Sequence, residues 1–393
     1  MNKVHTNFLR LLNNGLYDKH EPVDCTIEEV EYEAKNHICI PFIYKGAKNA
    51  EISIPQTWNN HMIVSALRNQ QNLQVQEFIL QQLTEADIPC AVLKGSTVSV
   101  NYNEPMLRTL GDIDILVNPS DYEKAIELLC GDEYEDESYE GHAFHYKYTF
   151  RGVAVEIHKF VTEYSSAEYG KTIEKLMSNA LDGVVQRQMD EFVFPSLSNK
   201  HQAATLLLHT QRHFFENRLP IKMLCDWAMF VRHVDLHEWK QDVFPFIEKM
   251  GLVDFCDALT ATVNVYLRAE CEEKVSKKVP EKMTEFIMQE FLNNGVLTDK
   301  DSLSQNIASS CSRQSTDSDS KIISMLLFLN EIARNEFVLA RKSCIFLPIF
   351  WIYIPIRFVF RQITGKRSGL SLNAFNDTLE RKKYIINKLK LKD

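Results

Sequence analysis

The chain has 393 residues, of which 45% are hydrophobic and 25% charged, as is typical of a globular protein large enough for two domains. Its net charge of -9 argues against broad, non-specific nucleic-acid binding, which needs a surface that neutralises phosphates, but leaves room for one local basic groove. The nine cysteines include no Cys-x-x-Cys pair and are odd in number, so we expect neither a zinc ribbon nor a disulfide framework. We also expect no signal peptide, and a cytoplasmic location fits best.

The first part of the chain mixes predicted helices and strands. We expect residues 1–57 to form a helical start followed by mixed short segments. Residues 58–83 contain few helix breakers and repeat apolar side chains at helical spacing, which predicts a long amphipathic helix. Residues 90–93 form a short apolar run that predicts a strand, closed by Lys94-Gly95-Ser96.

Further strands are predicted after residue 111. Residues 112–117 read as a strand, followed by a helix. Residues 145–151 and 153–160 predict two more strands, joined by a tight turn at Arg151-Gly152. This alternation of strands and helices indicates an α/β (α+β) domain, which we place over residues 58–170.

The remainder of the chain predicts helices. Residues 171–300 repeat apolar side chains at helical spacing and predict a helical domain. Residues 301–320 contain eight serines and predict a linker or loop. Residues 321–393 predict C-terminal helices with an apolar stretch and a basic tail.

The strongest chemical signal is Gly111-Asp112-Ile113-Asp114. Residues two apart in a strand share a face, so Asp112 and Asp114 point together while Ile113 faces the packed side. Two neighbouring carboxylates repel each other unless a cation lies between them. Hard divalent cations such as Mg²⁺, or Mn²⁺ in its place, take oxygen ligands of this kind together with substrate phosphates.

A third carboxylate is expected at the same centre. Glu156 and His158 share one face of the predicted strand 153–160, and if that strand lies beside the first, Glu156 joins the two aspartates. Three carboxylates can hold two metal ions for in-line phosphoryl chemistry. Glu156 could instead form a surface ion pair, and His158 either supports the metal centre or bonds to backbone.

The segment Lys94-Gly95-Ser96 is suited to phosphate. Glycine allows a phosphate to approach the backbone, and the following amides and the Ser96 hydroxyl can donate hydrogen bonds to it at a helix N-terminus. Lys94 adds a positive charge. Arg108, just before the aspartates, could clamp a triphosphate or form an ion pair with Asp112, and both readings stay open.

Polar residues in the helical half offer a second group of candidates. His209 and His213 are four apart, but no glutamate follows the first histidine, so zinc binding is disfavoured against packing or a role in an acceptor pocket. Lys222 and Asp226 have the spacing of a helical ion pair, and Asp226 is a further candidate for the acceptor pocket.

These motifs resemble a known family. Leu93-Lys94-Gly95, Tyr102, Arg108, Asp112 to Val117 and Val155 to His158 resemble the uncharacterised bacterial nucleotidyltransferase family of the polymerase-beta-like superfamily, and the likeness continues weakly around His209, His213, Lys222, Leu224, Asp226 and Trp227. The resemblance implies a mixed sheet flanked by helices, a Gly-Ser loop, a carboxylate pair and a third carboxylate on a neighbouring strand. Lys94 is a feature of this family, and the gap from Ser96 to Asp112 is longer than in small members of the superfamily.

The motifs and the resemblance together predict an enzyme. It would move a nucleoside monophosphate from a nucleoside triphosphate such as ATP to an acceptor hydroxyl on a small molecule, an RNA end or a protein, releasing pyrophosphate by a two-metal mechanism. One alternative is a protein of the same fold that senses nucleotides without turnover. Another is a structural or assembly protein of a surface-polysaccharide or toxin–antitoxin system.

The C-terminal region raises the question of a membrane. Residues 345–360 are apolar and aromatic, and residues 357–393 carry ten Lys or Arg against three Asp or Glu. Such a pattern suits an anionic membrane surface. Because Pro348 and Pro355 interrupt the stretch, we favour packing against the helical domain, with a solvated basic helix and at most peripheral, salt-sensitive membrane contact.

Overall fold

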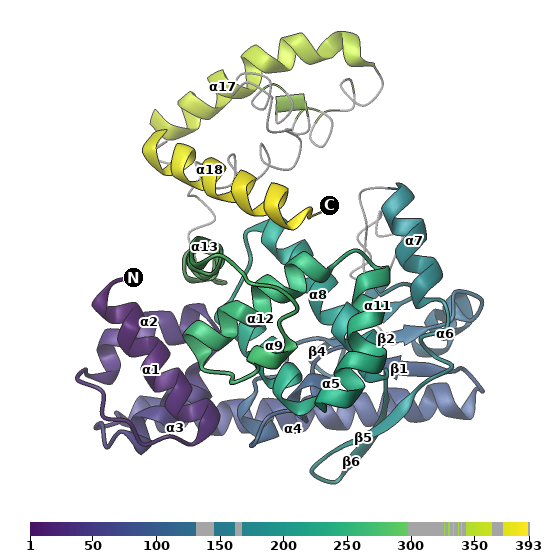
Figure 1. Cartoon of the computed structure of the whole chain (residues 1–393). Coiled ribbons are helices and arrows are strands. Elements are labelled where there is room, and N and C mark those ends of the chain that lie inside the picture. Colours follow the sequence, from purple (N-terminus) through teal and green to yellow (C-terminus); the bar gives the residue numbers. More distant parts are fainter. Residues whose placement is uncertain are drawn as a thin grey trace.

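The structure is a computed structural model that describes residues 1–130, 145–161, 167–297, 343–363 and 372–391, with positions 326, 329, 330, 333, 337 and 339. The predicted Ser-rich linker at 301–320 lies outside the described residues, as does most of the segment that follows it up to 342. Figure 1 shows a sheet on one side of the molecule, a body of helices packed against it, and two C-terminal helices beyond that body.

A mixed six-stranded sheet forms the centre of the α/β part, which confirms the expected fold class. Its strands are β1 (Cys90–Val92), β2 (Ile113–Val117), β3 (His145–Phe150), β4 (Val153–His158), β5 (Val185–Met189) and β6 (Phe192–Ser196), in the order β3-β4-β2-β1-β6-β5. Strand β2 runs parallel to β4 and antiparallel to β1, and β1 runs parallel to β6. The turn at Arg151-Gly152 has positive φ at both residues, as a tight hairpin requires.

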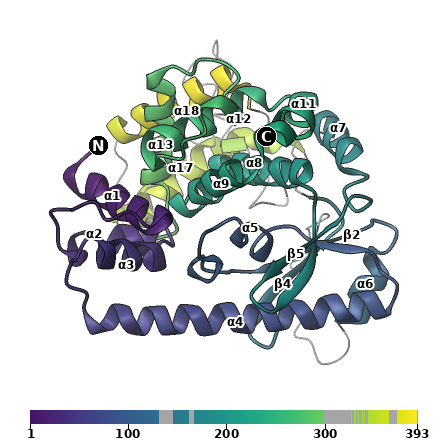
Figure 2. The ribbon, with the colours of Figure 1, turned by 60° about the horizontal axis from the view of Figure 1, so that its bottom comes forward.

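The two faces of the sheet pack against different layers. Ile113, Ile115 and Val117 of β2 are buried in a core shared with the 30-residue helix α4 (Gln56–Glu85) and with α6 (Tyr122–Leu129). Figure 2 shows α4 running beneath the sheet, with the helical half on the other side. Because side chains alternate along a strand, Asp114 points away from α4 and toward the helical half.

The sheet extends further along the chain than the sequence predicted. Strands β5 and β6 form a hairpin that joins the sheet beside β1, so the sheet includes residues after position 170. The sequence Val185-Gln186-Arg187-Gln188-Met189 hides this strand, because four of its five residues are at least partly exposed and it lies at the edge of the sheet.

The helical half and the N-terminal helices share one core. These helices are α1 (Lys3–Tyr17), α2 (Ile27–Asn36), α3 (Ile40–Asn49), α5 (Ser96–Ser99), α7 (Ala167–Met177), α8 (Asn199–Glu216), α9 (Ile221–His233), α10 (Leu236–Glu238), α11 (Phe244–Lys249), α12 (Val253–Leu267) and α13 (Glu281–Asn293). Helix α1 packs against α3 and α12, and Asn13 donates a hydrogen bond to the Tyr266 carbonyl. Residues 1–57 are therefore a part of the helical body.

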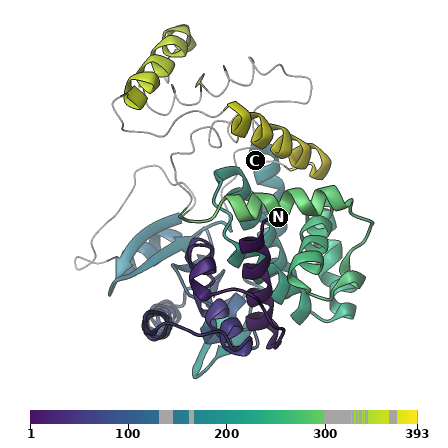
Figure 3. The same cartoon turned by 90° about the vertical axis from the view of Figure 1, so that its left-hand side faces the viewer.

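Two further helices complete the described chain, α17 (Leu347–Ile363) and α18 (Leu372–Leu389). Helix α18 packs on α12 and α13, and its Lys382 is fully buried while Lys388 is exposed, so the basic helix that we expected to be solvated is solvated only in part. Helix α17 is set apart from the helical body in two views (Figures 1 and 3) and packs instead on Leu329, Ala333 and Phe337. None of the described helices is both long and apolar enough to cross a membrane.

Candidate functional site

A cavity of about 330 Å³ lies between the sheet and the helical half. From the side of the sheet it is lined by Lys94, Gly95, Arg108, Asp112 and Asp114. From the helical half it is lined by His209, His213, Arg218, Lys222 and Asp226. Candidates predicted from separate parts of the sequence therefore share one cavity.

Asp114, Glu156 and His158 converge at the sheet end of this cavity. Asp114 on β2 and Glu156 on β4 are direct partners in the parallel register, so both carboxylates leave the same face of the sheet. The His158 Nε2 atom lies 3.0 Å from Asp114 Oδ1 and 3.3 Å from Glu156 Oε2. Among the described residues, these three offer ligand atoms within 4.8 Å of one another, a set that could hold a metal ion.

Asp112 lies beside this cluster, immediately before β2, where it is exposed and lines the cavity. Repulsion from the neighbouring Asp114 carboxylate is the main cause that raises the pKa of Asp112. The sequence grouped Asp112 with Asp114 and Glu156 and left His158 undecided. The three residues that converge are instead Asp114, Glu156 and His158, with Asp112 adjoining them.

Lys94 is the cation closest to the carboxylates. Its Nζ atom lies 2.8 Å from Asp114 Oδ1, the same oxygen that contacts His158. Burial opposes the charged form of this lysine, but the carboxylates of Asp114 and Asp112 overcome it and raise the pKa of Lys94. Burial would likewise raise the pKa of Asp114, yet the positive charges of Lys94 and His158 lower it.

Glu156 and His158 stabilise each other's charged forms. Burial disfavours the ionised Glu156, but hydrogen bonding and the charge of His158 lower its pKa. Burial would lower the pKa of His158, whereas its bonds to Asp114 and Glu156 raise it. The cluster is thus a set of alternating charges, in which each carboxylate has a cationic neighbour.

The turn at Gly95 brings backbone close to the carboxylates. Gly95 has φ +66° and ψ -112°, a conformation that side chains other than glycine's rarely adopt. The Ser96 hydroxyl is buried and donates a hydrogen bond to Gln76 Oε1 on α4 at 2.6 Å. Ser96 therefore fixes the turn to α4. We had expected its hydroxyl to donate to a phosphate, but in this structure it donates to Gln76.

Comparison with known proteins identifies the family. The sequence profile of a family described as "Uncharacterised nucleotidyltransferase" matches residues 26–268. The chain belongs to this family. No curated protein and no solved structure gives a significant match.

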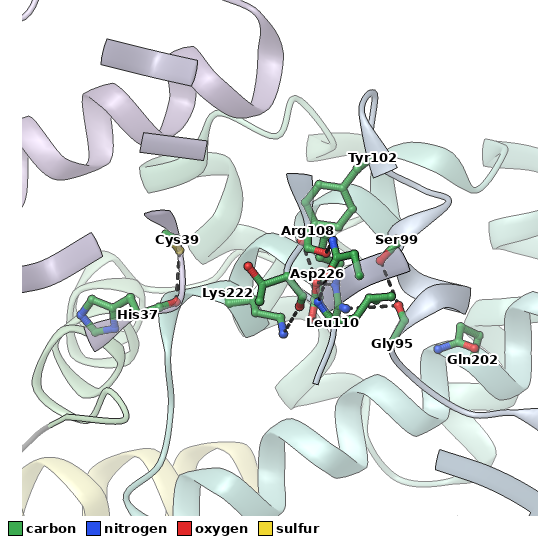
Figure 4. A network of polar contacts seen from close by, with 12 residues as sticks. His37, Cys39, Gly95, Ser99, Tyr102, Arg108, Leu110, Gln202, Lys222 and Asp226 are labelled. Carbon is green, nitrogen blue, oxygen red and sulfur yellow. Dashed lines mark hydrogen bonds and ion pairs between the residues drawn. The ribbon is translucent and has the colours of Figure 1, made fainter. Parts of the chain in front are cut away.

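In this nucleotidyltransferase, Arg108 joins the two halves of the cavity. Its Nε and Nη2 atoms donate to the two carboxylate oxygens of Asp226 at 2.6 and 2.8 Å, and Tyr102 donates to the same carboxylate at 2.6 Å. Arg108 Nη1 also donates to the Gly95 carbonyl at 3.2 Å (Figure 4). Of the two roles left open for Arg108, the ion pair with Asp112 is not formed, because the buried Asp226 is its partner.

Lys222 of the nucleotidyltransferase was predicted to pair with Asp226 but has a different partner. Its Nζ atom donates to the Thr109 carbonyl at 2.8 Å, in the loop that leads to Asp112 (Figure 4). Burial, then repulsion by Arg108, lowers the pKa of Lys222 to about 8. Arg218 also lines this wall of the cavity and was not predicted from the sequence, because no motif surrounds it.

The two histidines of the helical wall are uncharged at neutral pH. Their rings lie edge to face with centroids 4.4 Å apart on consecutive turns of α8. Burial and nearby cations lower the pKa of His209 well below its usual value, and burial lowers that of His213 to about 4. Neutral imidazoles can donate or accept hydrogen bonds, so this wall presents adaptable polar groups rather than charge.

Proposed function

We propose that this chain transfers a nucleoside monophosphate from a nucleoside triphosphate to an acceptor hydroxyl, with release of pyrophosphate. The observation that carries the proposal is the register of β2 and β4, which sets Asp114 opposite Glu156 at the end of a cavity beside the Gly95 turn. Membership of a nucleotidyltransferase family supports it. The cavity has the size of a small-molecule site.

The acidic cluster fits a divalent cation. Asp114 and Glu156 offer oxygens of the kind that Mg²⁺ or Mn²⁺ prefers, His158 offers a nitrogen in the same space, and Asp112 lines the adjoining cavity. Such an ion supplies charge that stabilises the phosphates in the transition state and lowers the pKa of an attacking hydroxyl. We retain two ions as the working mechanism, with the three carboxylates as their ligands.

The remaining residues of the sheet side bind and orient the nucleotide in this proposal. Because glycine has no side chain, the Gly95 turn allows a phosphate to approach its backbone closely. When nucleotide binds, the Lys94 ammonium would move from Asp114 to a phosphate oxygen. It would thus have a negatively charged partner both before and after binding. Arg108 acts indirectly, since its guanidinium is bound to Asp226 and holds the Gly95 carbonyl.

The helical half supplies the far wall of the cavity. Arg218 and Lys222 add positive charge there, while His209 and His213 provide neutral polar groups that could orient an acceptor hydroxyl. Asp226 is already bound to Arg108 and Tyr102, so we assign it a positioning role rather than contact with the acceptor. The acceptor itself remains a small molecule, an RNA end or a protein side chain.

A transfer assay tests the proposal. Purified protein with Mg²⁺ and each labelled triphosphate in turn should release pyrophosphate or label itself or an added acceptor. Asp114→Asn and Glu156→Gln should each reduce the rate by about a thousandfold, because the loss of a metal ligand costs several kcal/mol of transition-state stabilisation. Asp190→Asn, in the exposed turn between β5 and β6, is the matched control and should keep the wild-type rate.

Metal binding gives an independent measurement. Electron paramagnetic resonance of Mn²⁺ should show weaker binding to Asp114→Asn than to the control variant. Triphosphate binding without pyrophosphate release under all these conditions would instead support a nucleotide sensor. Wild-type transfer rates in Asp114→Asn would exclude the proposed site.

A further inference from the structure

Helix α17 presents an uncovered apolar face. Its members are Ile345, Ile349, Ile352, Tyr353 and Ile356, which we call the outer face. They are between 46% and 80% exposed, and their spacing of four, three, one and three residues places them along one side of the helix and of the short turn before it. Contiguous apolar surface of this kind on a protein usually marks an interaction site.

The opposite side of α17 is already packed. Leu347, Phe350 and Ile354 are less than 9% exposed and are buried with Leu329 and Ala333. The helix is therefore apolar on both sides, and the outer face is not needed for the contacts that hold it in the described chain. A helix that is apolar all round is ordinarily covered on every side.

Charge indicates what kind of surface covers the outer face. No Asp or Glu occurs between positions 337 and 376, whereas Arg357, Arg361, Lys366 and Arg367 do. Residues 357–393 carry ten basic against three acidic residues, and the residues before them carry 34 against 50. Of the ten basic residues, Arg381 and Lys382 contact Glu290 in the core and eight remain. An acidic protein with one basic, apolar end complements an anionic surface that also accepts apolar side chains. A second copy of α17 would bring like charges together.

The length of α17 limits how such a surface can be engaged. Seventeen residues span about 26 Å at the helical rise, which is shorter than the apolar core of about 30 Å in a bilayer. Pro355 inside the helix removes a further backbone hydrogen bond. The helix suits the interface between headgroups and acyl chains, where Tyr353 can keep its hydroxyl in water.

We propose that the outer face of α17 docks on an anionic lipid surface, to which the excess of basic residues in this part of the sequence attracts it. The contact is peripheral and does not depend on the transfer reaction. Figure 1 shows α17 beyond the helical body, at the end of the molecule away from the sheet, so docking there leaves the rest of the chain free.

Vesicle sedimentation of the full-length protein tests this. We expect binding to vesicles of equal parts phosphatidylcholine and phosphatidylglycerol, little binding to phosphatidylcholine alone, and loss of binding as salt is raised. Ile349→Ser with Ile352→Ser should weaken vesicle binding by about tenfold or more, because the variant lacks two apolar side chains that would be buried in the lipid. Both residues are exposed, so the fold should tolerate the change.

The matched control is Ile63→Ser with Leu67→Ser, which removes two equally exposed apolar side chains from α4. This control should bind vesicles like the wild type. Equal binding by the α17 variant and the wild type would overturn the proposal. So would a wild-type dimer in light scattering that the α17 variant dissociates, because the outer face would then be covered by a second copy.

Discussion

Lys94 is the residue whose side chain has two competing partners. It now contacts Asp114, and in the proposed reaction it contacts a phosphate. Lys94→Met should raise the KM for the triphosphate by about tenfold, as expected for one lost charge-assisted hydrogen bond. The same change should strengthen Mn²⁺ binding in the absence of nucleotide, because Asp114 loses a competing cation.

The control for Lys94 is Lys147→Met. Lys147 contacts Glu156 at 3.3 Å from the solvent side and does not line the cavity. Lys147→Met should leave the KM for the triphosphate within about twofold of the wild-type value, because it removes only an exposed ion pair. An unchanged KM in Lys94→Met would show that this lysine serves the acidic cluster alone.

Ser96 gives a prediction that separates stability from binding. Because its hydroxyl is buried and bonds to Gln76, Ser96→Ala should lower the free energy of unfolding by about 1 kcal/mol, through the loss of one buried hydrogen bond. The transfer rate at saturating triphosphate should stay within a few-fold of wild type. A large rise in KM with unchanged stability would mean that the hydroxyl turns to the phosphate when nucleotide binds.

His201 makes stability depend on pH. Its ring is buried, bonds to Ser198 and packs against Phe246, and its Nε2 atom has no hydrogen-bond partner. Burial and the charge of Lys200 lower its pKa to about 4. Below pH 6.5 His201 is protonated in the unfolded chain but not in the folded chain. The free energy of unfolding should therefore fall as the pH drops from 6.5 toward 4.

Thermal unfolding between pH 7.5 and 4.5 measures this effect. His201→Gln should flatten the decline by about 1–2 kcal/mol relative to the wild type. His61→Gln, on the exposed side of α4, should leave the slope unchanged. A slope equally steep in His201→Gln would assign the pH dependence to other groups, such as the carboxylates of the site.

At the scale of elements, one buried ion pair fastens α9 to the loop before β2. Asp226→Asn would leave Arg108 buried without a counter-charge, and should cost about 3–5 kcal/mol of unfolding free energy. Glu104→Gln, which breaks the exposed contact with Lys45, should cost less than about 1 kcal/mol. Urea unfolding of both variants makes the comparison, and equal costs would contradict the role assigned to Asp226.

Local patterns explain which elements could be predicted from the sequence. Alternating apolar and polar residues specify strands β2 and β4, and two adjacent residues specify the turn at Arg151-Gly152. The structure contains all three. The expected facing of Asp114 and Glu156 followed from that alternation once the strands were taken as neighbours.

The rest depends on contacts between distant segments. Arg108 and Asp226 are 118 residues apart, and Lys222 finds its acceptor 113 residues away at Thr109, so no local pattern indicates either contact. The partner of Ser96 lies on the preceding helix and is likewise set by packing. Strand β5 was not predicted for a different reason: four of its five residues are at least partly exposed at the edge of the sheet, so the segment lacks a clear apolar pattern.

At the scale of the whole molecule, the last helix completes the helical core. Lys382 of α18 is fully buried, donates to the Phe214 carbonyl at 2.6 Å and lies 3.5 Å from the buried Glu290. Arg381 contacts the other oxygen of Glu290. Lys382→Met should therefore lower the free energy of unfolding by about 3 kcal/mol, because it leaves Glu290 with one cation.

Lys388→Met is the control, because this lysine is exposed on the same helix. It should change stability by less than about 0.5 kcal/mol. Urea unfolding followed by circular dichroism would measure both, and matching midpoints would mean that α18 is an accessory to the core.

The order of Glu290, Arg381 and Lys382 along the chain has a consequence during synthesis on the ribosome. Glu290 is made 91 residues before Arg381, an interval of roughly 5–20 s at ordinary elongation rates. For that time α13 holds a carboxylate whose two cationic partners do not yet exist, and burying it alone would be costly. Helix α13 and the end of α8 can therefore close over Glu290 only after Arg381 and Lys382 have emerged from the ribosome, while the sheet and its carboxylates can assemble earlier.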